Sequence, residues 1–155
     1  MAEGLQCPSP MVVVASMPLH RAPRFLLLDP DPIALRTLRQ RVRERHPKWE
    51  VVSEHDARTA LAQLASREFD VLITEIALRE VSGIELLRQA SECAPATVRL
   101  VHAAHTRVKN VLCSAGLAYR VLEKPAEDSA LMPAITSALR MRREMSRPRS
   151  GWFVK

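Results

Sequence analysis

Residues 25–32 read FLLLDPDP, and this stretch decides the fold class. The four apolar residues at 25–28 form a continuous run of strand length, which is typical of a strand buried on both faces of a parallel sheet. The Asp-Pro-Asp-Pro sequence that follows ends the strand and predicts the start of a helix, because proline suits the first helical turn. A buried strand that leads directly into a helix is the first half of a strand–helix–strand unit.

The same alternation of strand-length and helix-length stretches continues along the chain. Further apolar runs predict strands at residues 50–53, 71–74, 98–101 and 119–122, and an amphipathic stretch of helix length follows each of them. Five strands that alternate with five helices predict an α/β fold, in which helices cover both faces of a doubly wound five-stranded parallel sheet.

The helix after the fourth strand is predicted from a stripe of apolar residues. Val108, Val111, Leu112 and Ala115 recur at helical spacing, and the helix is expected to end at Gly116 because glycine is a common stop residue. We therefore expect these four side chains to form the inner face of that helix.

The ordered domain is predicted at residues 24–145. Residues 1–23 hold four of the eleven prolines and show no helical periodicity, so we interpret them as a flexible N-terminal extension. Residues 146–155 form a basic C-terminal tail that carries half of the net charge of +6. Because the domain itself is only mildly basic, a nucleic-acid partner is not expected.

The composition also bears on the compartment. Hydrophobic residues make up 47% of the 155 residues and charged residues 26%, as in an ordinary globular protein. The longest uncharged stretch, residues 4–20, contains three prolines, so we expect neither a membrane span nor a secretory signal. Three cysteines in dissimilar contexts fit no disulfide framework and no metal spacing. These features favour a cytoplasmic protein.

Chemically distinctive residues follow four of the predicted strands. In an open parallel sheet, ligands bind outside the carboxyl ends of the strands, so residues at these positions are expected to share one pocket. They are Asp29, Pro30 and Asp31 after the first strand, Glu75 after the third, His102 after the fourth and Lys124 after the fifth.

Over residues 24–145 the chain resembles the receiver domain of bacterial two-component response regulators. The resemblance rests on four stretches in the expected order, LLLDPDP at 26–32, DVLITE at 70–75, VSGIELL at 81–87 and YRVLEKP at 119–125. It implies a flavodoxin-like sheet with the strand order 2-1-3-4-5.

The resemblance also implies roles for the pocket residues. In the family, an acidic pair after the first strand holds Mg²⁺, and an aspartate after the third strand accepts a phosphoryl group. A serine or threonine at the end of the fourth strand hydrogen-bonds that group, and a lysine before proline pairs with it. Asp29, Asp31 and Lys124 agree with this pattern.

Three positions depart from the family's pattern. Glu75 stands at the phospho-acceptor position, Pro30 replaces the second acid, and His102 replaces the hydroxyl residue. Mg²⁺ demands near-octahedral geometry, so its binding is expected to be weak or absent, and no other metal or cofactor is expected. Glutamate is one methylene longer than aspartate, so the Glu75 carboxylate is expected to lie further into the pocket than the family's aspartate. A misplacement of the reacting group by about 1 Å can lower the rate of phosphoryl transfer on the order of 100-fold. We therefore predict an atypical pseudo-receiver that is not an enzyme and does not run the phosphorylation cycle.

Two of these residues have alternative interpretations. Glu75 could mimic the phosphorylated state by meeting Lys124 where a phosphoryl oxygen would lie, or it could be a neutral replacement that satisfies the lysine. His102 could sense pH, because histidine titrates near neutrality, or it could simply be hydrogen-bonded at the end of its strand.

The function that follows is binding. We predict a stand-alone pseudo-receiver that acts as a phosphorylation-independent interaction module in bacterial signal transduction or regulation. The resemblance points to the face made by helix four, strand five and helix five, where we expect a protein partner or a second copy of the chain in a homodimer. The residues predicted for this face are Arg107, Val108, Tyr119 and Arg120.

Two other functions remain open. The first is an atypical but working phospho-accepting response regulator, which phosphoryl transfer in the presence of Mg²⁺ would reveal. The second is a binder of nucleic acid or of an anionic surface, through Arg36, Arg39 and Arg43 on the first helix together with the basic tail. Steep salt dependence of binding would be its mark.

Overall fold

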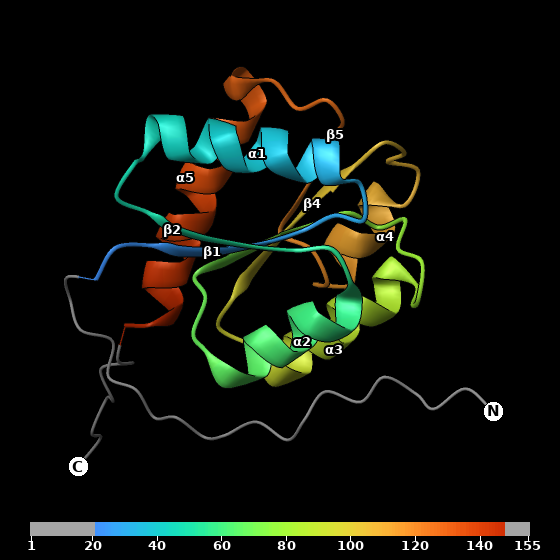
Figure 1. The fold of residues 1–155 in the computed structure, drawn as a ribbon. Helices are drawn as coiled ribbons and strands as arrows, with labels where there is room; N and C mark the ends of the chain where they lie inside the picture. The colour runs from blue at the N-terminus through green and yellow to red at the C-terminus, as the bar shows by residue number, and fades with distance from the viewer. Residues whose placement is uncertain (1–20, 148–155) are drawn as a thin grey trace, which may run out of the picture.

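A computed structural model describes residues 21–147 of the chain (Figure 1). Among these residues no helix is both long enough and apolar enough to cross a membrane. The predicted extension at 1–23 and the predicted tail at 146–155 lie outside the described residues, except for 21–23 and 146–147. In chain order the elements are β1 (Arg24–Leu28), α1 (Pro32–Arg45), β2 (Glu50–Glu54), α2 (Ala57–Ser66), β3 (Val71–Thr74), α3 (Gly83–Cys93), β4 (Val98–Ala103), α4 (Lys109–Ser114), β5 (Arg120–Glu123) and α5 (Asp128–Met145).

The strands form one parallel sheet in the order β2-β1-β3-β4-β5, which confirms the predicted fold class and strand order. The order reverses between β1 and β3, which are direct neighbours in the sheet, with Leu28 paired to Thr74. Residues that follow these two strands therefore begin side by side at the carboxyl edge of the sheet.

Short polar side chains start the helices that follow β1, β2 and β3. Asp31 Oδ1 accepts a hydrogen bond from Ile33 N at 2.9 Å, Asp56 accepts from Thr59 N, and Ser82 accepts from Glu85 N. Each cap satisfies an amide that has no partner inside the helix.

Gly83, at the start of α3, packs directly against the loop that follows β3. A Cβ atom at this position would lie 2.6 Å from the Cα of Ile76, so only glycine fits without a shift of the backbone. This close approach fixes the path of the chain next to Glu75.

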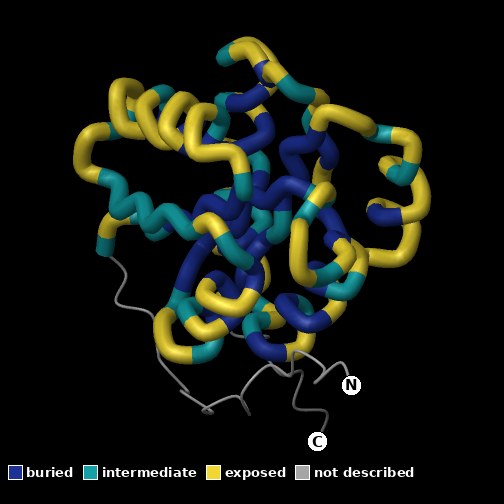
Figure 2. Tube along the Cα trace, turned by 45° about the vertical axis from the view of Figure 1, so that its right-hand side comes forward, coloured by how far each residue is buried: buried dark blue, intermediate teal, exposed yellow. Residues whose placement is uncertain are grey.

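The core has a layer on each face of the sheet. Figure 1 shows α1 and α5 over one face, with α2 and α3 over the other. The strands β1 and β3 are buried almost without interruption, as the dark centre of the trace in Figure 2 shows. β4 alternates between the layers: Val98 and Leu100 pack with α1 and α5, whereas Val101 and Ala103 pack with α4.

The predicted inner face of α4 is only partly correct. Leu112 is fully buried, but the side chain of Val111 is 61% exposed and Ala115 is exposed as well. Val108 precedes the helix and packs against the cluster around Leu112. The reason is the length of α4, since a helix of six residues turns less than twice and presents few side chains to the sheet.

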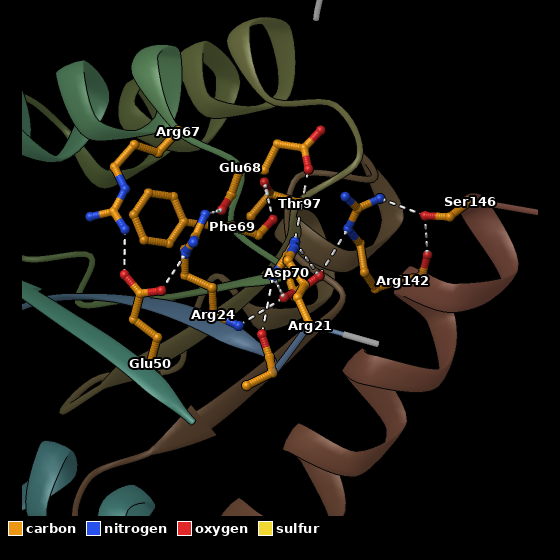
Figure 3. A network of polar contacts seen from close by, with 11 residues as sticks. Arg21, Arg24, Glu50, Arg67, Glu68, Phe69, Asp70, Thr97, Arg142 and Ser146 are labelled. Atoms are coloured by element: carbon orange, nitrogen blue, oxygen red, sulfur yellow. Dashed lines mark hydrogen bonds and ion pairs between the residues drawn. The ribbon is translucent and has the colours of Figure 1, made fainter. Parts of the chain in front are cut away.

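At the amino ends of the strands, a buried carboxylate joins the two ends of the described chain (Figure 3). Asp70 accepts hydrogen bonds from Arg21 Nη1 at 2.8 Å and from Arg24 N at 2.8 Å. Its other oxygen lies 3.5 Å from Nε of Arg142, in the last turn of α5. We call Arg21, Asp70 and Arg142 the amino-end cluster.

Candidate functional site

Three charged residues converge at the opposite edge of the sheet, where β1, β3 and β5 end. Lys124 Nζ lies 2.5 Å from Asp29 Oδ2 and 2.6 Å from Glu75 Oε2. The side chains of Asp29 and Glu75 are 5% and 7% exposed, and that of Lys124 is 18% exposed. We call these residues the carboxyl-end cluster. The sequence led us to expect Glu75 as the counter-charge of Lys124, and the structure adds Asp29 as a second one.

The carboxylate of Glu75 is fully engaged. While Oε2 faces Lys124, Oε1 accepts hydrogen bonds from Ile76 N at 2.7 Å and from Ala77 N at 3.1 Å. Burial alone would raise the pKa of Glu75, but the hydrogen bonds from Lys124 and from these two amides outweigh it and lower the pKa. Glu75 is therefore held as a carboxylate anion.

Lys124 is held as a cation by the same contacts. Burial alone would lower its pKa, but the hydrogen bonds to Asp29 and Glu75 dominate and raise it. One ammonium between two carboxylates leaves the cluster with a net charge of −1 at neutral pH.

The loop after β1 does not present a pair of acids. Asp29 Oδ1 accepts a hydrogen bond from Asp31 N at 2.9 Å, and the exposed Asp31 carboxylate caps α1 through Ile33 N. Pro30 lies between them and offers no side-chain ligand. Asp29 thus joins the cluster with Lys124, whereas Asp31 serves the start of the helix.

The receiver resemblance implies a Mg²⁺ ion here, and the donors present do not fit one. Each oxygen of Asp29 and of Glu75 already faces Lys124 or a backbone amide. Within residues 21–147 no group of three or more His, Cys, Asp or Glu side chains is placed to hold a metal ion. Weak or absent Mg²⁺ binding stays a prediction.

His102 lies inside β4 rather than after it, because the strand extends to Ala103, two residues beyond the predicted end. The ring is buried, and its Nε2 accepts a hydrogen bond from Ala126 N at 3.3 Å. His102, Lys124 and Pro125 line a hollow of about 260 Å³ against α1. His102 therefore lies beside the carboxyl-end cluster but contacts the loop that follows β5.

The four residues predicted for the interaction face lie around β5. Tyr119 packs against the cluster under α1 and α5, and the Arg120 guanidinium lies 5.7 Å from the centre of its ring. Val108 packs on the α4 side, in a different cluster, and Arg107 is exposed next to it. The structure thus brings Tyr119 and Arg120 together and places Arg107 and Val108 across the edge strand from them.

The sequence reading missed the backbone partners of this site. The amides of Ile76 and Ala77 bind Glu75, and the amide of Ala126 binds His102. No side-chain pattern signals a backbone group, since every residue except proline carries one.

Comparisons with known proteins agree with this fold. The family model of the response regulator receiver domain matches residues 25–136. Among curated proteins, the chain is 28% identical over 135 residues to the transcriptional regulatory protein TrcR of Mycobacterium tuberculosis, covering 84% of this chain and 52% of that protein. It is 25% identical over 121 residues to the transcriptional regulatory protein GlrR of Escherichia coli, covering 77% of this chain and 27% of that protein. The chain thus spans between about a quarter and half of the length of these relatives.

Solved structures show the same fold. A signal receiver domain of an HD domain-containing protein from Pseudomonas fluorescens superposes with a TM-score of 0.69 at 29% identity, covering 80% of this chain and 99% of that one. A CheY-like receiver domain protein from Methanospirillum hungatei superposes with a TM-score of 0.73 at 22% identity, covering 80% of this chain and 98% of that one. With its strand order and a family match over most of the domain, the chain belongs to the response regulator receiver domain family.

Proposed function

We propose that this receiver domain is a pseudo-receiver, a non-enzymatic binding module whose signalling state is set by a standing ion cluster instead of by phosphorylation. The observation that carries the proposal is the position of Lys124, whose ammonium is bound by both Asp29 and Glu75. In the family this lysine pairs with the transferred phosphoryl group, and here its charge is already matched inside the protein.

Phosphoryl transfer to this site would face two costs. An incoming phosphoryl group would have to displace Glu75 from Lys124 and from the two amides that hold its other oxygen. It would also arrive at a cluster that already carries a net charge of −1, where a further anion is repelled. Phosphoryl transfer depends on positioning and on charge neutralisation, and neither is available in this arrangement.

The binding surface we propose is the edge around β5. Tyr119, Arg120 and Arg107 lie there, and a parallel edge strand leaves backbone groups available to a partner. The partner is a protein of a bacterial regulatory pathway, in keeping with the transcriptional regulatory proteins that the chain is similar to, or a second copy of the chain.

A working phospho-acceptor is the second candidate. Its support is that Asp29, Glu75 and Lys124 do meet at the carboxyl ends of the strands, where the family carries out its chemistry. The two candidates differ in whether the Glu75 carboxylate can be labelled.

The deciding experiment uses intact mass spectrometry. The unmodified chain and the Glu75→Asp variant are incubated with acetyl phosphate and Mg²⁺, and we expect neither to gain the mass of a phosphoryl group. A receiver domain that carries the family's aspartate is treated in parallel, and its gain of a phosphoryl group shows that the conditions support transfer. Labelling of the unmodified chain would overturn the pseudo-receiver proposal, whereas labelling of Glu75→Asp alone would show that Pro30 and His102 do not block the chemistry.

A further inference from the structure

The protonation state of His102 follows from its hydrogen-bond partner. The residue is 9% exposed, and its Nε2 accepts from Ala126 N at 3.3 Å. A backbone amide can only donate, so Nε2 carries no proton and the neutral ring holds its proton on Nδ1. The contact exists only while His102 is uncharged.

The residue that His102 binds lies in the loop that follows Lys124. Ala126 is buried, its amide faces His102, and its carbonyl oxygen accepts from Arg41 of α1. At the start of the loop, Lys124 N donates to Ala103 O at 2.8 Å. The loop is thus fastened to β4 at two points, one through the backbone and one through the imidazole, and to α1 at a third.

We propose that His102 is an acid-released brace for the loop between β5 and α5. The neutral imidazole holds Ala126 and fixes the backbone that follows Lys124. Protonation places a hydrogen on Nε2, which then opposes the hydrogen of the Ala126 amide. The bond breaks, and the loop separates from β4 on the side of the hollow next to α1.

The charged groups around the His102 ring determine the pH at which it takes up a proton. Arg41 from α1 and Lys124 after β5 oppose a positive charge on His102, while Asp29 after β1 and Glu75 after β3 favour one. Asp31 lines the mouth of the same hollow. Both inner carboxylates are already shared with Lys124, so burial and the two cations prevail and lower the pKa of His102. The hydrogen bond from Ala126 N to His102 therefore stays formed at neutral pH and breaks in acid.

The hollow gives the proton a route to the ring. It holds about 260 Å³ and is lined by His102 together with Ile33 and Thr37, and Ile33 is 65% exposed at its rim. Water can therefore reach the side of the ring without global unfolding.

This inference does not rest on the pseudo-receiver proposal. The state of Glu75 as a phospho-acceptor is read by mass spectrometry, whereas the brace is read from His102 and Ala126 by NMR. Failure of one therefore leaves the other standing.

The test begins with the tautomer in the unmodified full chain. Long-range proton–nitrogen NMR correlations at about pH 7.5 should show His102 as the neutral Nδ1–H form. As the pH is lowered, the amide of Ala126 should lose hydrogen-exchange protection in step with the titration of His102. For release coupled to one proton, protection falls about tenfold for each pH unit between the ordinary histidine value of 6.5, which applies to the released ring, and the lowered pKa of the bonded ring, after correction for intrinsic exchange.

Three variants separate the brace from a merely structural role. His102→Gln keeps an acceptor that does not titrate, so Ala126 should stay protected at every pH. His102→Leu has no acceptor, so protection should be low throughout. His105→Gln removes an exposed histidine nearby and should leave the pH profile unchanged. An Nε2–H tautomer in the unmodified chain would overturn the proposal even if no variant folded. The proposal would also be overturned if the hydrogen-exchange protection of the Ala126 amide did not change with the titration of His102.

Discussion

The two ends of the sheet hold buried ion clusters of opposite design. At the carboxyl end one ammonium, Lys124, lies between two carboxylates, whereas at the amino end one carboxylate, Asp70, lies between two guanidiniums. The three residues of the first cluster carry a net charge of −1 and those of the second a net charge of +1, with Glu68 lying 3.9 Å from Arg21 beside the second cluster. Both consist of side chains far apart in the sequence, brought together because parallel strands end at common edges.

The difference between the clusters lies in the cation. The Arg21 guanidinium grips both oxygens of Asp70, with Nη1 at 2.8 Å and Nη2 at 3.2 Å, a planar two-point contact that fixes orientation. Lys124 is a point charge on a flexible stem, which can move between acceptors. The amino-end cluster is therefore suited to hold the ends of the domain together, and the carboxyl-end cluster is suited to respond to a change of charge.

The largest expected effect comes from Asp70→Asn, which breaks the amino-end cluster. The amide keeps an acceptor for Arg24 N but removes the counter-charge of the buried Arg142, and it leaves Arg21 with Glu68, 3.9 Å away. We expect the free energy of unfolding to fall by about 3–5 kcal/mol, measured by urea denaturation followed by tryptophan fluorescence.

Glu50→Gln is the matched control. Glu50 also pairs with two arginines, Arg24 and Arg67, but its side chain is 41% exposed, so its loss should cost under about 1 kcal/mol. Equal costs for the two variants would show that burial does not distinguish these ion pairs.

Lys124→Met should be the next largest effect, and it should depend on pH. The change leaves Asp29 and Glu75 as two buried carboxylates without their shared cation. We expect a loss of about 2–3 kcal/mol at pH 7, which becomes smaller in acid as one carboxylate takes up a proton. Denaturation at about pH 7 and about pH 5 measures the difference. A loss that is independent of pH would mean that the two carboxylates do not interact.

Glu75→Gln is a smaller perturbation of the same cluster. Glutamine keeps an acceptor for the amides of Ile76 and Ala77, and Asp29 still pairs with Lys124. We expect a cost of about 1–2 kcal/mol in the free energy of unfolding at pH 7. If Glu75 mimics the phosphorylated state, binding of the protein partner also weakens, and if Glu75 is a neutral replacement, binding is unchanged. Partner affinity measured beside stability distinguishes these outcomes.

The sequence predicted the fold and the edge of the sheet where the site lies. Strand-length apolar runs and capping residues are local signals, and parallel topology places Asp29, Glu75 and Lys124 at one edge. The pairing of Arg21 with Asp70 joins residues 49 positions apart and gives no local signal.

The features that the sequence predicted wrongly or did not predict have a common physical cause. Val111 fits a helical stripe in the sequence, but its exposure depends on how few turns of α4 reach the sheet. The bond between His102 and Ala126 uses a backbone amide, which the pattern of side chains does not reveal. Local propensity is encoded in short stretches, whereas these contacts are decided by tertiary packing.

The narrowest expected effect, because it concerns the charge of one side chain, is the acid dependence of the contribution of Glu75 to stability. The pKa of Glu75 is lowered in the folded protein, against the burial that would raise it, by Lys124 and the two amides. A lowered pKa means that the unfolded chain binds the proton more readily than the folded one, so the contribution of Glu75 is fully present above its ordinary value of 4.5. It is lost as the pH falls from 4.5 through the folded pKa. The gap in stability between the unmodified chain and Glu75→Gln, about 1–2 kcal/mol at pH 7, should therefore close below pH 4.5. Urea titrations of both proteins across this range measure the gap, with Glu50→Gln as the exposed control. A gap that stays constant through the acid range would show that shape and hydrogen bonding, not the charge of Glu75, stabilise the carboxyl-end cluster.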